Sequence, residues 1–224
     1  PGTTWNQRAR ADKPDWMSPR MAWRAIQSAL PRDAIISSDI GNNCAIGNAY
    51  PSFDEGRKYL APGLFGPCGY GLPSIVGAKI GQPDVPVVGF AGDGAFGISV
   101  NELTAIGRDE WPAITQIVFR NYQWGAEKRN STLWFDDNFV GTELDKKVSY
   151  AGIAKACGLN GVQVKSMDEL TAVLNQAIKD QMENNKTTLI EVMLNQELGE
   201  PFRRDAMKKP VQVAGVAAAD MAAE

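Results

Sequence analysis

The sequence has 224 residues, 44% of them hydrophobic, which is enough for one large domain with a sizeable core and flanking tails. Its net charge of −3 argues against a general nucleic-acid-binding surface. The sequence contains no histidine, which excludes catalytic schemes with a histidine base and zinc sites with histidine ligands.

The chain begins with a polar segment, residues 1–16, that has the composition of a linker. Ser18 and Pro19 are typical of a helix start, and apolar residues follow them at helical spacing. Further along the chain, strand and helix patterns alternate. We expect strands at residues 34–38, 87–91, 115–119, 162–164 and 188–192, and helices at residues 19–30, 73–79, 100–106, 150–156 and 167–182.

Two segments in the second half of the chain carry additional signals. Residues 122–150 are aromatic and irregular, which is typical of a functional loop. Ser166 and Glu169 predict a capping box at the start of the helix at 167–182. We expect the domain itself to occupy residues 17–195, with a C-terminal extension and tail at residues 196–224.

The alternation of strands and helices predicts an α/β fold. The strands are almost continuously apolar, which indicates a mostly parallel sheet with helices on both faces. Ligands of such sheets bind at the carboxyl ends of the strands. Asp39, Asp93 and Asn121 each follow a predicted strand, so we expect the functional site there.

The cysteines and the apolar segments indicate the surroundings of the protein. Cys44, Cys68 and Cys157 are widely spaced and show no metal-ligand pattern, so we expect free thiols in a reducing, cytoplasmic compartment. No signal peptide and no apolar run long enough to cross a bilayer is visible, so we expect no membrane partner.

The most informative motif is Gly92-Asp93-Gly94, followed after one further strand by Asn121-Tyr122-Gln123. Two parallel strands would deliver a carboxylate and a carboxamide to the same edge of the sheet. Both are oxygen ligands of the kind that Mg²⁺ and Ca²⁺ prefer. The glycines allow backbone to approach a bulky anion. The motif therefore predicts a divalent cation that links the protein to a diphosphate.

Two other interpretations of this motif stay open. Residues 92–97 also match the dinucleotide fingerprint, although an aspartate facing a pyrophosphate repels it unless a cation intervenes. Arg120 could then favour NADP over NAD. In the other interpretation, Asp93 caps a helix and Asn121 fills a turn, with no ligand involved.

The same motif resembles the thiamine-diphosphate-binding signature. The chain resembles the C-terminal, diphosphate-binding domain of the acetolactate synthase and pyruvate oxidase superfamily, over about residues 5–213. The loops at residues 38–43 and 66–73 are similar to the segments of that family that surround the cofactor. Within the superfamily, residues 121–130 and 195–210 resemble sulfoacetaldehyde acetyltransferases.

The resemblance implies two cofactors, thiamine diphosphate and Mg²⁺. The metal ligands would be the side chains of Asp93 and Asn121 and the backbone carbonyl of Gln123. The resemblance also implies a set of cofactor-binding residues that comes from four loops: Asp39, Gly41, Asn42, Asn43, Gly66, Cys68, Gly92, Gly94, Ala95, Tyr122 and Gly125.

The implied reaction converts sulfoacetaldehyde and phosphate to acetyl phosphate and sulfite. Cys68 would support the bent cofactor, in a position where relatives have a larger apolar residue. Lys128 and Arg129, with Arg203 and Arg204, would bind the anionic substrates. One alternative is a pyruvate-processing enzyme of the same superfamily. An alternative of another class is a non-catalytic module that binds Mg²⁺ and a nucleotide such as NADP.

One part of the implied enzyme has no counterpart in this sequence. Members of the superfamily activate the cofactor with a glutamate from a pyrimidine-binding domain, usually across a subunit interface. We therefore expect a pyrimidine-binding domain, in the same or a partner chain, to complete the site. The resemblance also implies a homo-oligomer, either a dimer or a tetramer.

Overall fold

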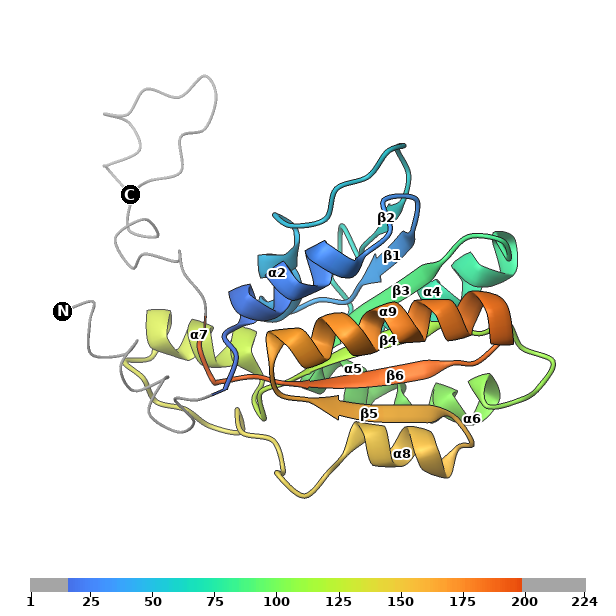
Figure 1. Cartoon of the computed structure of the whole chain (residues 1–224). Helices are drawn as coiled ribbons and strands as arrows, with labels where there is room; N and C mark the ends of the chain where they lie inside the picture. The colour runs from blue at the N-terminus through green and yellow to red at the C-terminus, as the bar shows by residue number, and fades with distance from the viewer. Residues whose placement is uncertain (1–15, 199–224) are drawn as a thin grey trace.

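The computed structural model describes residues 16–198, which form a single sheet covered by helices (Figure 1). All strand pairs are parallel, and the order is β2-β1-β3-β4-β6-β5. This arrangement confirms the predicted fold class. The strands are β1 (Ile35–Ser38), β2 (Tyr59–Leu60), β3 (Val87–Gly92), β4 (Thr115–Arg120), β5 (Asn160–Val164) and β6 (Thr188–Met193).

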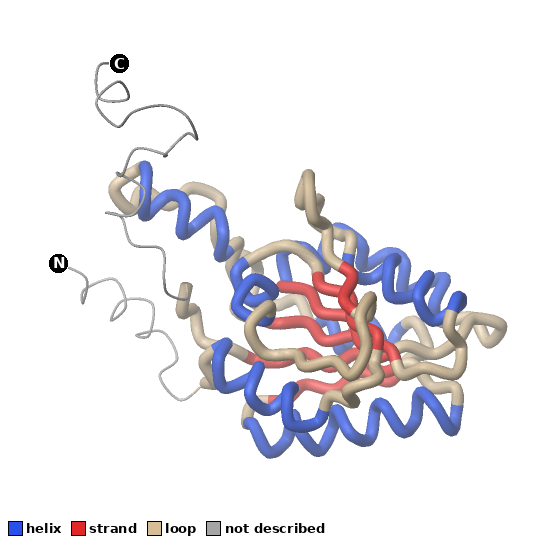
Figure 2. The backbone as a smooth tube through the Cα atoms, turned by 90° about the horizontal axis from the view of Figure 1, so that it is seen from above, coloured by secondary structure: helices blue, strands red, loops and turns tan. Residues whose placement is uncertain are grey.

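The helices cover both faces of this sheet (Figures 1 and 2). β2 has no counterpart among the predicted strands, because two residues carry no periodic pattern. No helix within residues 16–198 has the length and apolarity needed to cross a membrane. The helices are α2 (Pro19–Ala29), α3 (Asn42–Gly47), α4 (Gly71–Gly81), α5 (Asp93–Ser99), α6 (Leu103–Ile106), α7 (Gly125–Trp134), α8 (Tyr150–Ala156) and α9 (Met167–Asn184).

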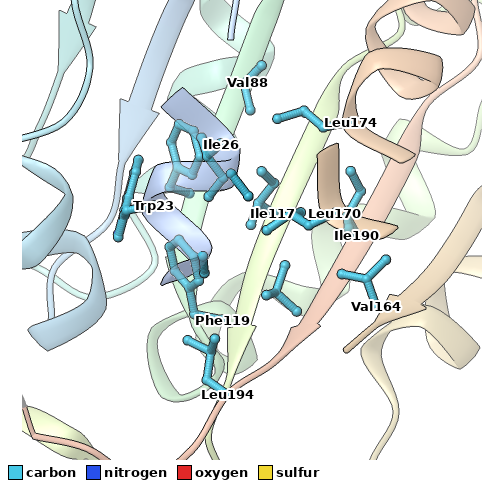
Figure 3. Close-up of a cluster of buried hydrophobic side chains, with 14 of the residues drawn as sticks. Trp23, Ile26, Val88, Ile117, Phe119, Val164, Leu170, Leu174, Ile190 and Leu194 are labelled. Carbon is cyan, nitrogen blue, oxygen red and sulfur yellow. The ribbon is translucent and has the colours of Figure 1, made fainter. Parts of the chain in front are cut away.

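Helices α2 and α9 lie side by side on one face of the sheet (Figure 1). Their apolar side chains pack on β3, β4 and β6, and the largest of them, Trp23, is 1% exposed. Burial of a large apolar side chain stabilises the fold by about 1.5–3 kcal/mol. Figure 3 shows this core with Trp23, Ile26, Val88, Ile117, Phe119, Val164, Leu170, Leu174, Ile190 and Leu194.

Helices α4, α5, α6 and α8 cover the opposite face. Leu72 and Ile75 of α4 and Phe96 of α5 are fully buried against the sheet. The two cores together explain why the central strands are apolar on both sides, as the sequence pattern predicts.

Capping side chains fix two helix starts as predicted. The Ser18 hydroxyl accepts a hydrogen bond from the backbone of Met21 at the start of α2. Ser166 and Glu169 form the capping box of α9. Each such cap contributes about 1 kcal/mol to helix stability.

Gln181 connects α9 to the sheet in the interior. Its Oε1 accepts from the backbone N–H of Val87 at 2.8 Å, and its Nε2 donates to the Val87 carbonyl at 2.8 Å and to the Thr115 hydroxyl at 3.0 Å. The side chain of Gln181 thus provides hydrogen-bond partners for both backbone groups of Val87, the first residue of β3.

Three predicted segments differ from the structure. The segment 122–150 is not irregular throughout, because α7 occupies Gly125–Trp134, where Ala, Glu, Lys and Arg favour a helix despite the flanking aromatic residues. The segment at residues 38–43, expected to be a loop, gives way to α3 at Asn42. The helix predicted at 100–106 is a 3₁₀ turn (Val100–Glu102) followed by α6, and α5 precedes both.

Candidate functional site

Three helices begin at the carboxyl ends of three strands that are neighbours in the sheet. α3 follows β1, α5 follows β3 and α7 follows β4, and the sheet order places β1, β3 and β4 side by side. The first backbone N–H groups of a helix have no partner within that helix. Three sets of such donors therefore face one edge of the sheet, which favours an anion there.

A cleft of about 160 Å³ lies between these helix starts. It brings together most of the predicted site residues: Gly41, Asn42, Asn43, Gly66, Cys68, Gly92, Asp93, Gly94, Ala95, Asn121, Gln123 and Gly125. Its wall also includes Ile40, Trp124, Ala126 and Glu127, which are not among the predicted site residues. Glu127 lies in the first turn of α7, so only a correct prediction of that helix could have placed it at the cleft.

Asp93 is almost completely buried, with 1% of its surface exposed. Its Oδ2 accepts hydrogen bonds from Arg120 Nη1 at 3.1 Å, from the Asn121 N–H at 3.1 Å and from the Tyr122 N–H at 2.6 Å. Its Oδ1 accepts one from the Gly94 N–H at 3.1 Å. Burial raises the pKa of this carboxyl to about 6, against the opposing effect of Arg120. Oδ1 thus retains capacity for a further partner.

Four amide side chains of the cleft have a buried oxygen without a hydrogen-bond partner among the described residues: Asn42, Asn43, Asn121 and Gln123. The orientation of two of these amides is fixed by their nitrogen atoms. Asn42 Nδ2 donates to the carbonyls of Gly125 and Leu198, and Gln123 Nε2 donates to the carbonyl of Gln196. An oxygen-lined wall with unmet acceptors fits a cation better than it fits an anion.

The glycines of the cleft are required by their surroundings at two positions. A Cβ on Gly94 would lie 2.7 Å from the indole ring of Trp124, which packs against the start of α5. Gly41, which precedes α3, has a backbone φ of 130°. Residues other than glycine rarely adopt this backbone conformation. These positions let backbone form the wall of the cleft directly.

Asp39 is a predicted cofactor-binding residue that lies beside the cleft but does not line it. Its carboxylate accepts hydrogen bonds from the N–H groups of Ile40 at 2.8 Å, Gly69 at 3.1 Å and Gly71 at 2.7 Å. Burial raises its pKa, and these backbone bonds oppose the shift. Asp39 thus holds the loop that carries Cys68 against the end of β1.

Cys68 lies in the wall of the cleft, where the sequence predicts it. Partial burial raises the pKa of its thiol, and the carboxylates of Asp39 and Glu127 act in the same direction. The thiol is therefore protonated near neutral pH. This state suits a packing role and does not suit a nucleophile, for which the thiolate is required.

The predicted anion-binding residues do not line the cleft. Lys128 forms an ion pair with Glu143, and its ammonium group lies 5.2 Å from the ring centre of Phe139. Arg129 lies on the same helix, and partial burial lowers its pKa. Arg203 and Arg204 lie outside the described residues.

Tyr122 contributes to the site through its backbone. Its φ of 60° is unusual for a residue with a side chain, and this conformation turns its N–H towards Asp93 Oδ2. Its ring packs on the guanidinium of Arg120 and does not line the cleft. The sequence pattern does not indicate a structural role for Arg120, since an arginine within an apolar strand has no spacing that marks it.

Comparison with known proteins gives a consistent result. A family model described as "Thiamine pyrophosphate enzyme, C-terminal TPP binding domain" matches residues 39–192. The chain is 83% identical to a sulfoacetaldehyde acetyltransferase of Roseovarius nubinhibens and 77% identical to one of Rhodobacter capsulatus, over 99% of this chain in each case. It spans 36% and 37% of those proteins, so it corresponds to about a third of their length. These identities confirm the resemblance drawn from the residues.

Solved structures share the fold. A thiamine diphosphate-dependent 4-hydroxybenzoylformate decarboxylase of Rhodococcus jostii superimposes with a TM-score of 0.71 at 24% identity, over 81% of this chain and 33% of that chain. A benzoylformate decarboxylase of Polynucleobacter necessarius gives a TM-score of 0.72 at 20% identity, over 86% and 35%. The match of the family model over most of the domain shows that the chain belongs to the thiamine pyrophosphate enzyme family, as its C-terminal TPP-binding domain.

Proposed function

We propose that the full-length protein uses thiamine diphosphate and Mg²⁺ to convert sulfoacetaldehyde and phosphate to acetyl phosphate and sulfite. The observation that carries this proposal is the 83% identity, over 99% of this chain, to a protein named sulfoacetaldehyde acetyltransferase. The cleft supports it independently, because its composition suits a diphosphate held through a divalent cation.

The residues of the cleft fit the proposed cation. Asp93 Oδ1 and Asn121 Oδ1 are oxygen atoms with capacity for a further partner, on buried residues that directly follow the neighbouring strands β3 and β4. In the proposal they bind Mg²⁺ together with the backbone carbonyl of Gln123, which lines the same cleft. One carboxylate and two neutral oxygens neutralise only one of the two positive charges of Mg²⁺. The remaining charge is available to bind the diphosphate.

Other residues of the cleft would bind and enclose the cofactor. The first N–H groups of α3, α5 and α7 would donate to the diphosphate. Cys68 and Ile40 would supply an apolar wall, and Trp124 would exclude water. When bound, thiamine diphosphate supplies the carbon nucleophile and electron sink of the reaction.

The remaining length of the relatives supports a second component of the site. Because this chain spans about a third of them, we propose that a pyrimidine-binding domain of the same or a partner chain contributes the activating glutamate. We further propose a dimer or tetramer in the cytoplasm, where the three free cysteines stay reduced.

Lys128 and Arg129 remain our candidates for contacts with the anionic substrates. They directly follow Glu127, which lines the cleft, on the first turns of α7. Lys128 would have to leave Glu143 to reach a bound anion.

The pyruvate-processing alternative has weaker support. An acetolactate synthase of Escherichia coli is 26% identical over 73% of this chain, far below the acetyltransferases. A dinucleotide-binding module is not favoured, because the family that matches the chain binds thiamine pyrophosphate.

The decisive experiment measures sulfite release by the full-length protein. We expect sulfite from sulfoacetaldehyde only when thiamine diphosphate, Mg²⁺ and phosphate are all present, with acetyl phosphate as the second product. Pyruvate supplied in place of sulfoacetaldehyde should give little carbon dioxide. Rapid carbon dioxide release from pyruvate, without sulfite from sulfoacetaldehyde, would favour the acetolactate synthase-like alternative.

A further inference from the structure

Arg120 ends β4 between two buried carboxylates. Its Nη1 donates to Asp93 Oδ2 at 3.1 Å, and its Nε lies 3.6 Å from Glu191 Oε1. The side chains of Arg120 and Glu191 are each 1% exposed, as is that of Asp93. The guanidinium is thus a buried cation shared by two acids, one of which belongs to the cleft.

The remaining arm of the guanidinium binds a distant segment. Nη2 donates to the carbonyls of Asp145 at 2.6 Å and Val148 at 3.0 Å, which lie just before α8. The ring centres of Tyr122 and Tyr150 lie 4.1 Å and 5.3 Å from Arg120 Cζ. Only a planar, forked donor can make these contacts at once, which a lysine ammonium cannot do.

Glu191 is held in place from the opposite side. Its Oε2 accepts from the Ser149 hydroxyl at 3.1 Å, from the Ala151 N–H at 3.1 Å and from Gln163 Nε2 at 2.9 Å. Since these bonds fix Glu191, its carboxylate in turn holds the guanidinium of Arg120 beside Asp93. The Tyr150 hydroxyl completes the arrangement by donating to the Asp93 carbonyl at 2.8 Å.

We propose that Arg120 is a positioning residue for the divalent cation: it occupies Oδ2 of Asp93 so that Oδ1 faces the cleft, and Glu191 orients Arg120 for this task. This inference rests on the proposed cation site. In this inference the three residues, Asp93, Arg120 and Glu191, act as one triad that orients a ligand of the cation. Groups that orient a metal ligand in this way typically contribute 10- to 100-fold to metal affinity.

The test compares two variants that each disturb a buried cation. Arg120→Lys keeps the charge but loses the fork beside Asp93. Lys79→Met removes a buried ammonium that donates to the carbonyls of Pro83 and Val85 and forms no hydrogen bond or ion pair with Asp93, Arg120 or Glu191. Both should lower the thermal midpoint. Free Mn²⁺ would be measured by electron paramagnetic resonance during titration of the full-length protein with thiamine diphosphate present.

We expect Arg120→Lys to weaken Mn²⁺ binding by about 10- to 100-fold, while Lys79→Met stays within about twofold of the wild type. If Arg120→Lys does not fold, Glu191→Gln serves instead, because its amide nitrogen would face Arg120 Nε and displace the guanidinium. Unchanged Mn²⁺ affinity in the folded variant, or an equal loss in Lys79→Met, would overturn the inference. A wild-type protein that binds no Mn²⁺ would overturn the proposed cation site as well.

Discussion

Asn121 carries a buried oxygen atom that no donor among the described residues satisfies. Such an atom costs about 1–3 kcal/mol of folding free energy when it lacks a partner. Asn121 and Asp93 line the same cleft, and the Asn121 N–H donates to Asp93 Oδ2. A cation at this point would remove the cost, so the residue links stability to ligand binding.

We predict that Asn121→Ala weakens Mg²⁺-dependent binding of thiamine diphosphate by at least about tenfold. The thermal midpoint without ligand should change little, because the substitution removes an unsatisfied oxygen together with its amide. Calorimetry with and without Mg²⁺ measures the first effect. Asn160→Ala, at the exposed start of β5, is the control. Undiminished Mg²⁺-dependent affinity in Asn121→Ala would show that this oxygen does not bind the cation.

The raised pKa of Asp93 predicts a pH dependence of metal binding. Since burial raises this pKa to about 6, the carboxyl is increasingly protonated as the pH falls below that value. A cation must then displace the proton, so its affinity should fall with falling pH, by up to about tenfold per pH unit. Titrations with Mn²⁺ at pH 5, 6 and 7 measure this. Equal affinity at pH 5 and pH 7 would contradict the assignment of Asp93.

At the scale of elements, the buried side chain of Gln181 joins α9 to the start of β3. Gln181 satisfies both backbone groups of Val87 at the start of β3. Helix and sheet are therefore joined by hydrogen bonds as well as by the apolar core shown in Figure 3. A change at this one position should affect two elements at once.

We predict that Gln181→Leu destabilises the domain by about 2–4 kcal/mol, because it leaves two buried backbone groups without partners. For a domain of this size, the thermal midpoint should fall by about 4–16 °C. Gln176→Leu, on the exposed side of the same helix, should shift the midpoint by far less. A similar shift in both variants would mean that the hydrogen bonds of Gln181 contribute nothing specific.

The sequence predicts the elements of this fold that have strong periodic patterns. The five longer strands and helices α2, α4, α8 and α9 are confirmed, because their apolar spacing and caps are local properties. Helices α3 and α7 were not predictable in this way. Both begin at glycine-containing turns, where the signal for a loop is as strong as the signal for a helix.

The candidate site was predictable to a similar extent. The glycines, asparagines and Asp93 of the motifs do line one cleft, because strand ends bring them together. Arg120 and Glu191 could not be found, since buried charged residues in strands are recognised only by their partners. The ion pair between Lys128 and Glu143 could not be found either, because the two residues are distant in the sequence.

At the scale of the whole molecule, the cleft is built on one side only. Its described wall comes from the segments that follow β1, β3 and β4 and from the loop between β2 and α4, which carries Gly66 and Cys68. The matched relatives are almost three times as long as this chain. Figures 1 and 2 show α7 extending from this end of the sheet, away from the two covering layers. The opposite wall must come from another domain if the proposed function is correct.

We therefore predict that the isolated 224-residue chain does not release sulfite from sulfoacetaldehyde. The sequence contains no histidine, and no segment of it resembles the pyrimidine-binding domain that would supply the activating glutamate. Acid–base assistance is typically worth about 10²- to 10⁴-fold in rate. The full-length protein, assayed in parallel, should restore phosphate-dependent sulfite release. Turnover by the isolated chain at the rate of the full-length protein would refute this division of labour.

The buried Asp93–Arg120–Glu191 triad also bears on how such a domain can evolve. Replacing a buried ionic group with well-packed apolar residues is often neutral or stabilising, by about 1–4 kcal/mol. A lineage under selection for stability alone would therefore lose these charges, and a lineage that keeps them accepts a less stable interior. A triple apolar variant that melts at a higher temperature and no longer binds Mn²⁺ would expose this trade-off in a single protein.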